Sequence, residues 1–451
     1  MTQSLTEQLL PALRRPIPTD VRRRAALHVL DWIGCASLGA TTEVGRVFGM
    51  DARAWGPGPA LVLGGARHPG RAAAFANGAF GNVFEMDDLH KEAIAHPGPV
   101  VVPAALAAAE AAGASGPAFL DAVVRGYEAM IRLGRSMGPG HYRHFHPTAT
   151  CGAFGAGAAV GDILGLDDAA LVSALGNAAT QAAGLWQCRH EPVMTKQLHT
   201  ARAAEAGYAA AALAAGGLTG PRYILEGTQG LFAAMAPDGA PDRFLADPDG
   251  PWLVTETSIK PWAACRHAHA AIDAALLLRE ACGSRLPERI TVLTFADAIT
   301  FCDRPEPRSS IEARFSLQHA VAVTLLGGPP PLSAFEKDGI DQPDVAALRR
   351  CVRVRLAEPY ASAYPRRFGS GLEAEFADGT TLAAAAPDAL GDPENPLSEH
   401  AVIAKAHSLL EAAGTRPAAA ADIARAALSL ATGGSLPELT RQLLPNQNKE
   451  D

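Results

Sequence analysis

Apolar residues recur every three or four positions through most of the first 260 residues of the chain. Side chains at this spacing lie on one face of a helix, so the pattern predicts a series of core-facing helices. Ser115 and Asp167 precede two of these segments, while Gly113 and Gly165 follow two others, as is typical of helix ends. No comparable strand pattern appears before residue 285, and this part is therefore predicted to be all-helical. The expected helices are 20–39, 75–86, 100–112, 116–133, 152–164, 167–185 and 198–215.

The pattern changes after Cys282, where short alternating segments rich in β-branched residues begin. Such segments predict strands, and Ala377-Asp378-Gly379 is a turn sequence that predicts a hairpin between the last two. One helix, 316–326, is expected among them. The expected strands are 290–295, 352–356, 372–376 and 380–384.

Helical spacing returns after Pro396, in residues 400–413 and 418–430. We therefore predict a mainly α fold, with a smaller α+β lid domain inserted before the C-terminal helices of a large all-helical domain. The predicted boundaries are 1–264 plus 391–451 for the helical domain and 265–390 for the lid domain.

Composition narrows the class of protein. The 451-residue chain is 48% hydrophobic and 19% charged, which is typical of a folded protein with a sizeable core. Its net charge of −8 argues against a nucleic-acid partner, and no apolar run reaches the roughly 18 residues of a membrane helix. The abundant alanine predicts close helix packing. Seven scattered cysteines without a C-x-x-C pair predict free thiols in a reducing, cytoplasmic location, and argue against structural zinc or iron–sulfur sites.

The segment from Asp87 to His96 concentrates titratable side chains directly ahead of an alanine-rich helix. It carries two aspartates, two histidines and a lysine, and Pro97 and Pro99 then restrict the backbone. One interpretation is that His96 and either Asp87 or Asp88 line an acid–base pocket. The other is a solvated loop in which Asp88 caps the helix. The spacing alone leaves both open.

Two further clusters also lie at predicted helix starts. His141, His144 and His146 precede a glycine-rich helix whose N-terminal amides favour an anion. The H-x-H pair could also indicate a metal, but it has no third ligand at helical spacing. Lys196 and His199 lie three residues apart, and therefore on one helix face. A lysine at this end opposes the helix dipole, which mildly favours a functional role over a solvated cap.

The last cluster runs from Lys260 to His269, at the predicted domain junction. Lys260, Arg266 and a histidine could form a cationic patch for carboxylates; the alternative is a hinge whose charges face water. Phosphate-binding glycine loops and the G-x-S-x-G sequence are both missing from the chain, which argues against phosphoryl transfer, nicotinamide-dependent hydride transfer and serine hydrolysis.

Taken in order, these clusters resemble the MmgE/PrpD family over most of the chain. The matching sequences are Asp-Asp…His-Pro at 87–97, His-x-Thr-x-Thr-x-Gly at 146–152, Thr-Lys-x-Leu-His at 195–199, Leu-Glu-Gly-x-x-Gly at 225–230 and Lys-Pro-x-x-x-Cys-Arg-x-x-His at 260–269.

The resemblance implies a helical domain with an α+β lid, a homodimer, and no metal, nucleotide or organic cofactor. The family includes 2-methylcitrate dehydratase, cis-aconitate decarboxylase and iminodisuccinate epimerase. Leu89 and His319 depart from residues common in the family and are expected to border the substrate. The catalytic residues that it implies are His96, His146, Lys196 and Lys260. The substrate-binding residues expected are Asp87, His90, His199, Arg266, His269 and His319.

The function expected from this resemblance is a cofactor-independent lyase, either a dehydratase or a decarboxylase. It would act on a small di- or tricarboxylate by histidine and lysine acid–base chemistry at the carbon next to a carboxylate. An epimerase of a small dicarboxylate such as iminodisuccinate could use the same groups. A non-catalytic helical binding protein is a further alternative, and a metal hydrolase is a more distant one. The sequence does not separate the lyase from the epimerase.

Overall fold

The computed structural model describes residues 2–191 and 193–444, which divide into two compact units. Of the described residues, unit 1 comprises 2–83, 87–191, 193–257 and 398–444. Unit 2 comprises Phe84–Met86 and Ser258–Leu397. The lid domain predicted from the sequence falls inside unit 2, and its exact boundaries stay a prediction.

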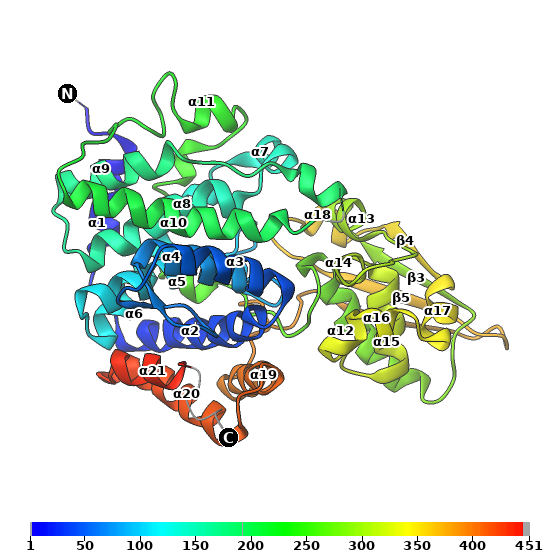
Figure 1. Cartoon of the computed structure of the whole chain (residues 1–451). Coiled ribbons are helices and arrows are strands. Elements are labelled where there is room, and N and C mark those ends of the chain that lie inside the picture. Colours follow the sequence, from blue (N-terminus) through cyan, green and yellow to red (C-terminus); the bar gives the residue numbers. More distant parts are fainter. Residues whose placement is uncertain (1, 192, 445–451) are drawn as a thin grey trace, which may run out of the picture. The chain divides into compact units, whose positions relative to one another are not determined.

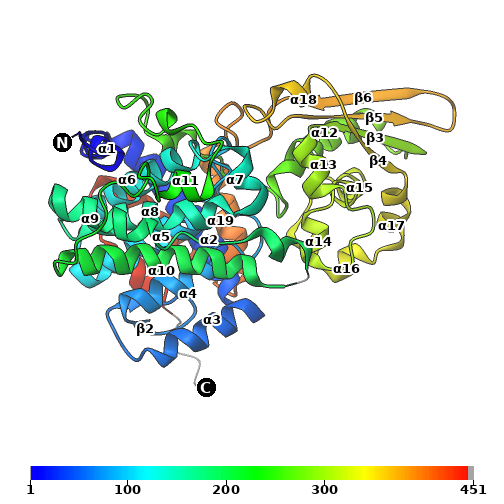
Figure 2. The same cartoon turned by 90° about the horizontal axis from the view of Figure 1, so that it is seen from above.

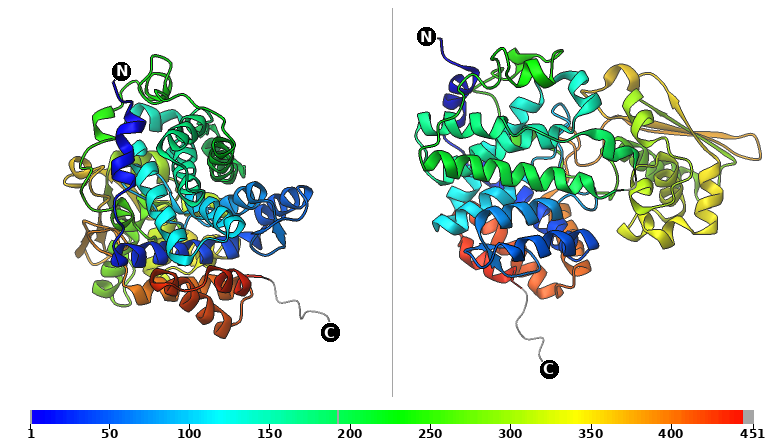
Figure 3. Two further views of the ribbon diagram at one scale, coloured as in Figure 1. Left: turned by 90° about the vertical axis from the view of Figure 1, so that its left-hand side faces the viewer. Right: turned by 45° about the horizontal axis from the view of Figure 1, so that its top comes forward.

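Unit 1 is built from long helices that pack side by side (Figures 1 and 3). Helix α10 packs against α8, α4 and α9, and the C-terminal α19 packs against α2. Its α-helices are α1 (Leu5–Leu13), α2 (Thr19–Ala40), α3 (Glu43–Ala54), α4 (Gly70–Phe80), α5 (Gly98–Ala112), α6 (Gly116–Gly134), α7 (Gly138–His144), α8 (Pro147–Ile163), α9 (Asp168–Ala179), α10 (Thr195–Ala215), α11 (Leu231–Met235), α19 (Glu399–Ala412), α20 (Pro417–Ser429) and α21 (Leu436–Gln442). Its 3₁₀ turns are η1 (Trp186–His190), η2 (Pro241–Arg243), η3 (Leu253–Glu256) and η5 (Leu430–Thr432).

Small residues allow α8 and α10 to approach closely. A Cβ atom added at Gly207 of α10 would lie 2.4 Å from the Cβ atom of Ala156 in α8. Ala153, Ala206 and Ala210 belong to one buried cluster between these helices. The close packing predicted from the alanine content is thus present between α8 and α10.

One prediction for this unit is wrong in detail, because it contains a small sheet. Strand β1 (Ala60–Leu61) pairs antiparallel with β2 (Arg67–His68). The Asn77 side chain on α4 donates to the carbonyl of Leu61 at 2.7 Å and accepts the N–H of Leu63 at 2.9 Å. Strands of two residues are too short to show an alternating pattern in the sequence.

Unit 2 contains a four-stranded sheet with the strand order β4-β3-β5-β6 (Figure 2). The β3–β4 pair is parallel, and the β3–β5 and β5–β6 pairs are antiparallel. Helix α12 packs against β5, β6 and α15. The strands are β3 (Arg289–Thr294), β4 (Val352–Leu356), β5 (Ser370–Glu375) and β6 (Thr381–Ala386). The helices are α12 (Arg266–Cys282), α13 (Ala296–Cys302), α14 (Ser310–Arg314), α15 (Leu317–Gly327), η4 (Leu332–Phe335), α16 (Lys337–Ile340), α17 (Pro343–Arg350) and α18 (Tyr360–Ala363).

The predicted fold class is confirmed. Of the residues that the structure describes, 59% are helical and 8% are in strands, so the fold is mainly α with a small α/β part. All four strands predicted in the second half of the chain are present, and the hairpin turns at Gly379, whose φ of 81° favours glycine. Across the part of the chain that is described, no helix is both long enough and apolar enough to span a bilayer.

Candidate active site

Two histidines from neighbouring helices form the centre of the candidate site. His146 immediately precedes α8, and its backbone N–H donates to the carbonyl of Gly184 at 2.9 Å. His199 lies in the first turns of α10, three residues after Lys196. Because α8 and α10 pack together, the Nδ1 atoms of His146 and His199 lie 3.2 Å apart. Both side chains are buried.

This contact constrains where the two rings carry their hydrogens. Two Nδ1 atoms form a hydrogen bond only when one carries a hydrogen and the other does not. If both rings are neutral, the donating ring keeps a lone pair on Nε2, and the accepting ring has its hydrogen on Nε2. The pair therefore presents one Nε2 atom that can accept a proton and one Nε2 atom that can donate a hydrogen bond. Such a pair can both take a proton from a substrate and return one to it.

Lys196 and the protein interior keep both rings neutral near pH 7. Burial, followed by the charge of Lys196, holds the pKa of His146 well below its ordinary value. The same two causes lower the pKa of His199 to about 4. The indole of Trp186 covers His146, with the ring centroids 4.3 Å apart. The result is a desolvated imidazole pair beside an ammonium group.

A third histidine approaches this pair from the loop before α5. Nδ1 of His96 lies 2.9 Å from Oδ2 of Asp87, which also accepts a hydrogen bond of 2.8 Å from Nδ2 of Asn82. The backbone N–H of His96 donates to Oγ1 of Thr148 at 3.1 Å. The ring centroids of His96 and His146 are 6.3 Å apart. Asp87 therefore orients a histidine at the edge of the pair.

The neighbouring Asp88 has a structural role instead. Oδ1 of Asp88 accepts the N–H of Gly98, the first residue of α5, at 2.8 Å. Its Oδ2 accepts the hydroxyl of Tyr127 at 2.6 Å and lies 2.8 Å from Nδ1 of His28. The sequence left open which aspartate faces the site; the geometry favours Asp87, and Asp88 caps α5.

His90 is buried in the same loop but contacts other groups. Its Nδ1 accepts the N–H of Ala93 at 3.3 Å. Burial, followed by the charge of Arg135, lowers its pKa to about 3. Its contact with substrate stays a prediction.

The H-x-H sequence does not form a ligand pair, because His144 is exposed while His146 is buried. His141 instead places Nε2 2.8 Å from Oγ1 of Thr150. Within residues 2–191 and 193–444, no group of three or more His, Cys, Asp or Glu side chains is arranged to hold a metal ion.

The remaining predicted site residues belong to unit 2. Lys260 is fully buried, and its Nζ donates to the carbonyl of Glu85 at 2.8 Å and lies 4.0 Å from Oε2 of Glu85. The Arg266 guanidinium pairs with the Asp392 carboxylate and donates to the carbonyl of Leu390 at 3.0 Å. Arg266 thereby ties the start of α12 to the segment after β6.

Two histidines of this unit have both ring nitrogens engaged. His269 lies 3.0 Å from Nη1 of Arg266 and 3.0 Å from the carbonyl of Ala264. His319 lies 2.8 Å from the carbonyl of Ala334 and 3.2 Å from Nη1 of Arg349, and burial lowers its pKa to about 4. Substrate contacts of these residues, and the catalytic role of Lys260, stay predictions.

Sequence reasoning missed several residues of these sites. Asn82 falls inside the predicted helix 75–86, although α4 ends at Phe80, and Trp186 directly follows the predicted helix 167–185. No periodic signal marks either of them. The Cys265–His267 pair had a signal, because both residues open a helix two positions apart; Sγ of Cys265 lies 3.2 Å from Nδ1 of His267. Burial raises the pKa of the Cys265 thiol, but hydrogen bonds from Cys302 and His267 outweigh it and lower that pKa.

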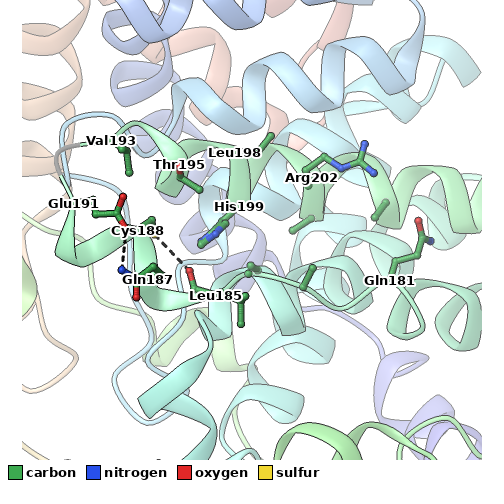
Figure 4. Close-up of a pocket in the computed structure, with 15 residues that line it drawn as sticks. Gln181, Leu185, Gln187, Cys188, Glu191, Val193, Thr195, Leu198, His199 and Arg202 are labelled. Atoms are coloured by element: carbon green, nitrogen blue, oxygen red, sulfur yellow. Dashed lines mark hydrogen bonds between the residues drawn. The ribbon is translucent and has the colours of Figure 1, made fainter.

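A cavity of about 590 Å³ opens beside the histidine pair (Figure 4). The His199 ring projects from α10 toward the segment that carries Leu185 and Gln187. The Gln187 side chain donates to Glu191 at 2.8 Å across this segment. The lining residues also include Ala149, Ala183, Val193, Leu198, Arg202, Ala203 and Ala206.

Comparison with known proteins places this chain in a family. The model of the MmgE/PrpD N-terminal domain matches residues 7–243, and that of the MmgE/PrpD C-terminal domain matches residues 262–430. Together they cover most of the chain. The chain belongs to the MmgE/PrpD family.

Its curated relatives include three decarboxylases or decarboxylase-like proteins. Cis-aconitate decarboxylase from Aspergillus terreus is 28% identical over 425 residues, covering 87% of this chain and 86% of the relative. The cis-aconitate decarboxylase-like protein oryM from Aspergillus oryzae is 30% identical over 361 residues, covering 74% of each chain. Human cis-aconitate decarboxylase is 29% identical over 374 residues, covering 77% of this chain and 76% of the relative.

Proposed function

We propose that this protein is a cofactor-independent lyase that decarboxylates a small unsaturated polycarboxylate of the cis-aconitate type. The observation that carries the proposal is the contact between Nδ1 of His146 and Nδ1 of His199 beside Lys196. The names of the relatives, which align over most of the chain, support the choice of a decarboxylase among the lyases.

The reaction has simple requirements. The bond between a carboxylate carbon and its neighbour breaks, carbon dioxide leaves, and the electron pair is delocalised onto a remaining carboxylate. A proton then adds to carbon. The protein must hold the carboxylates, stabilise the delocalised charge and supply the proton.

Lys196 is suited to the electrostatic part of this work. Its ammonium group lies close enough to His146 and His199 to lower the pKa of both rings. An ammonium in a desolvated site interacts strongly with carboxylate and enediolate charge. The burial of the histidines and the cover that Trp186 provides support a site of low water content.

The histidines are suited to proton transfer. A bound polyanion raises the pKa of neighbouring imidazoles, so a ring that is neutral in the free protein gains a proton when substrate binds. That imidazolium can then protonate the carbon after carbon dioxide leaves. His96, oriented by Asp87, is a third candidate for the acid or base.

Lys260 is proposed to bind a substrate carboxylate, as the family resemblance implies. Arg266, His269 and His319 are retained as expected substrate-binding residues on the same ground. A homodimeric state and a cytoplasmic location likewise stay predictions.

Proton NMR in D₂O tests the proposal directly. Purified protein is incubated separately with cis-aconitate, citrate, 2-methylcitrate and iminodisuccinate. We expect cis-aconitate to lose one carboxylate as carbon dioxide and to gain deuterium on carbon. Hydration or dehydration without carbon dioxide, or deuterium exchange without net loss, would instead assign a dehydratase or an epimerase. No reaction with any of the four acids would contradict the proposal.

A further inference from the structure

Two cysteines and a histidine form a cluster in unit 2 that the proposed decarboxylation does not use. Cys265 directly precedes α12, and Cys302 is the last residue of α13. The two helices pack together (Figure 2). His267 lies in the first turn of α12, with its Nδ1 atom 3.2 Å from Sγ of Cys265. All three side chains are buried, and both thiols are free. Two thiols that are distant in sequence thus lie beside one imidazole.

The imidazole of His267 directs its polar contact at the Cys265 sulfur. Within the described part of the chain, its buried Nε2 atom has no hydrogen-bond partner. His269 and His319 differ in this respect, because both nitrogens of each ring are engaged. When Cys265 is ionised, Nδ1–H of His267 donates to the sulfur. This contact is the arrangement expected of a histidine that activates a thiol.

Aromatic rings hold this imidazole in place. The ring of Phe301 stacks with His267, with the centroids 5.2 Å apart and the planes 2° from parallel. Phe368 stacks with it as well, at 5.3 Å and 26°. Stacked rings restrict the rotation of the imidazole, and their faces attract a positive charge. The surroundings of His267 therefore favour a fixed donor to the sulfur.

The two sulfur atoms differ in charge. Burial raises the pKa of the Cys265 thiol, but the hydrogen bond from Cys302 and the charge of His267 outweigh burial and hold that pKa well below its ordinary value. The positive end of the α12 dipole acts in the same direction. Burial, followed by the hydrogen bond to Cys265, raises the pKa of Cys302 well above its ordinary value. One thiolate and one protonated thiol are therefore adjacent.

We infer that Cys265 and Cys302 are a site of reversible oxidation by hydroperoxides. The Cys265 sulfur attacks hydrogen peroxide: the S–O bond forms, the O–O bond breaks, and the leaving hydroxide takes a proton and departs as water. Cys302 then loses its proton and attacks the resulting sulfenic acid. The S–S bond forms, the S–O bond breaks, and a second water leaves. Each thiol has given up one hydrogen, and the peroxide is reduced to water. A thiol reductant reverses the reaction. The inference is independent of the proposed function.

Other buried cysteines provide the comparison. Burial raises the pKa of Cys151 to about 12, and it also raises the pKa of Cys282 at the far end of α12. A protonated thiol is a poor nucleophile toward peroxide. Oxidation should therefore select Cys265 and spare Cys151 and Cys282.

The first experiment maps the oxidation product. The parent protein carries Cys188→Ser and Cys351→Ser, which remove two half-buried thiols from the background. It is treated with hydrogen peroxide, unfolded, alkylated and digested for mass spectrometry. We expect a cross-linked peptide that joins Cys265 to Cys302, and dithiothreitol should restore both thiols. If both thiols stay reduced at a dose of peroxide that oxidises free cysteine, the inference is wrong.

Three variants of this parent then test the order of events. Cys302→Ser should accumulate a sulfenic acid on Cys265 that dimedone traps, and Cys265→Ser should leave Cys302 reduced. His267→Gln should slow the oxidation of Cys265 by about tenfold or more, because the sulfur loses the group that keeps it ionised. Oxidation of Cys302 at an unchanged rate in Cys265→Ser would overturn the inference.

The matched control is Cys282→Ser, which removes a buried thiol from the same helix as His267. It should keep both the parental rate of oxidation and the cross-link. A cross-link that maps to Cys282 in the parent, or disappears in this control, would contradict the assignment of the pair. The map of the parent needs no substitution in unit 2, so the test holds even if one of the variants fails to fold.

Discussion

Asp87 and Asp88 are adjacent in sequence and both are buried, yet their contacts indicate different roles. Asp87 accepts from Asn82 and faces His96, whereas Asp88 accepts from the start of α5 and from Tyr127. Because the two carboxylates have separate partners, substituting each one separately distinguishes an effect on kcat from an effect on the free energy of unfolding.

We predict that Asp87→Asn lowers kcat by about a hundredfold, because His96 loses the charge that orients it. Asp88→Asn should instead lower the free energy of unfolding by about 1–3 kcal/mol, the usual effect of weakening a buried charged acceptor. Urea unfolding and steady-state kinetics on both variants measure the two effects. Equal losses of activity and stability in the two variants would contradict the assignment.

The neutral state of His146 and His199 leads to a prediction about binding. Their pKa values lie below neutrality in the free protein, and the charge of a bound polycarboxylate raises them. Binding should therefore take up protons, and affinity should weaken as the pH rises from about 5 to 8. Calorimetry at pH 6.5 in buffers of different ionisation enthalpy gives the number of protons. The uptake should shrink in His199→Gln; release of protons by the wild type would refute this explanation.

At the scale of elements, the α8–α10 contact is what brings the two histidines together. The sequence predicted both helices, since alanine and glycine recur in them with helical spacing. It could not predict their pairing, because a run of small residues allows many partners. The resemblance to a family named His146 and Lys196 as catalytic, but their arrangement with His199 follows from the packing of Gly207 against Ala156.

We predict that Gly207→Ala lowers the free energy of unfolding by about 1–3 kcal/mol and reduces activity, because the new methyl group separates α8 from α10. The matched control is Gly49→Ala on α3, where the nearest atom is 3.7 Å from the added Cβ. That variant should gain up to about 1 kcal/mol, since alanine favours a helix over glycine. Thermal and urea unfolding measure both, and a Gly207→Ala protein as stable as the wild type would show that the helices can separate without cost.

The predicted helix ends failed where the chain approaches the site. The expected helix 75–86 is α4, which ends at Phe80, and the expected helix 167–185 is α9, which ends at Ala179. After each end the chain takes an irregular path, the first supplying Asn82 and the second Trp186. Apolar spacing continues through residues 81–86 because most of them are buried, whereas residues 180–185 are exposed or half-buried and continue the apolar spacing without belonging to the core. Burial and helicity give the same pattern over a few residues, so the sequence could not separate them.

At the scale of the whole molecule, periodicity was enough for the fold class and for all four strands of unit 2. The four clusters of titratable residues were also identified from the sequence, and three of the four catalytic residues that the resemblance implied lie in unit 1. The sequence could not show that Asp88, His269 and His319 have their polar atoms engaged within the protein. That depends on contacts with Tyr127, Ala264 and Ala334, which are distant in sequence or lack any motif.

We predict that turnover survives prolonged dialysis against EDTA or 1,10-phenanthroline. The reason is the arrangement of the side chains that could bind a metal. His144 is exposed while His146 is buried, and the described residues contain no cluster of three His, Cys, Asp or Glu side chains. Rates before and after chelation, with metal analysis of the protein, give the result. Loss of activity that one divalent metal restores would overturn the prediction.

Of the three candidate histidines, we propose that His146, which contacts His199, transfers the proton in the decarboxylation. The most direct measurement is carbon dioxide release from cis-aconitate by the wild type, His146→Gln and His144→Gln. His144 is exposed two residues away, so its variant controls for the loss of an imidazole in the same segment. We predict that His146→Gln lowers kcat/KM by about a hundredfold or more while His144→Gln keeps the wild-type value. A His146→Gln enzyme that releases carbon dioxide at the wild-type rate would show that His146 does not transfer the proton.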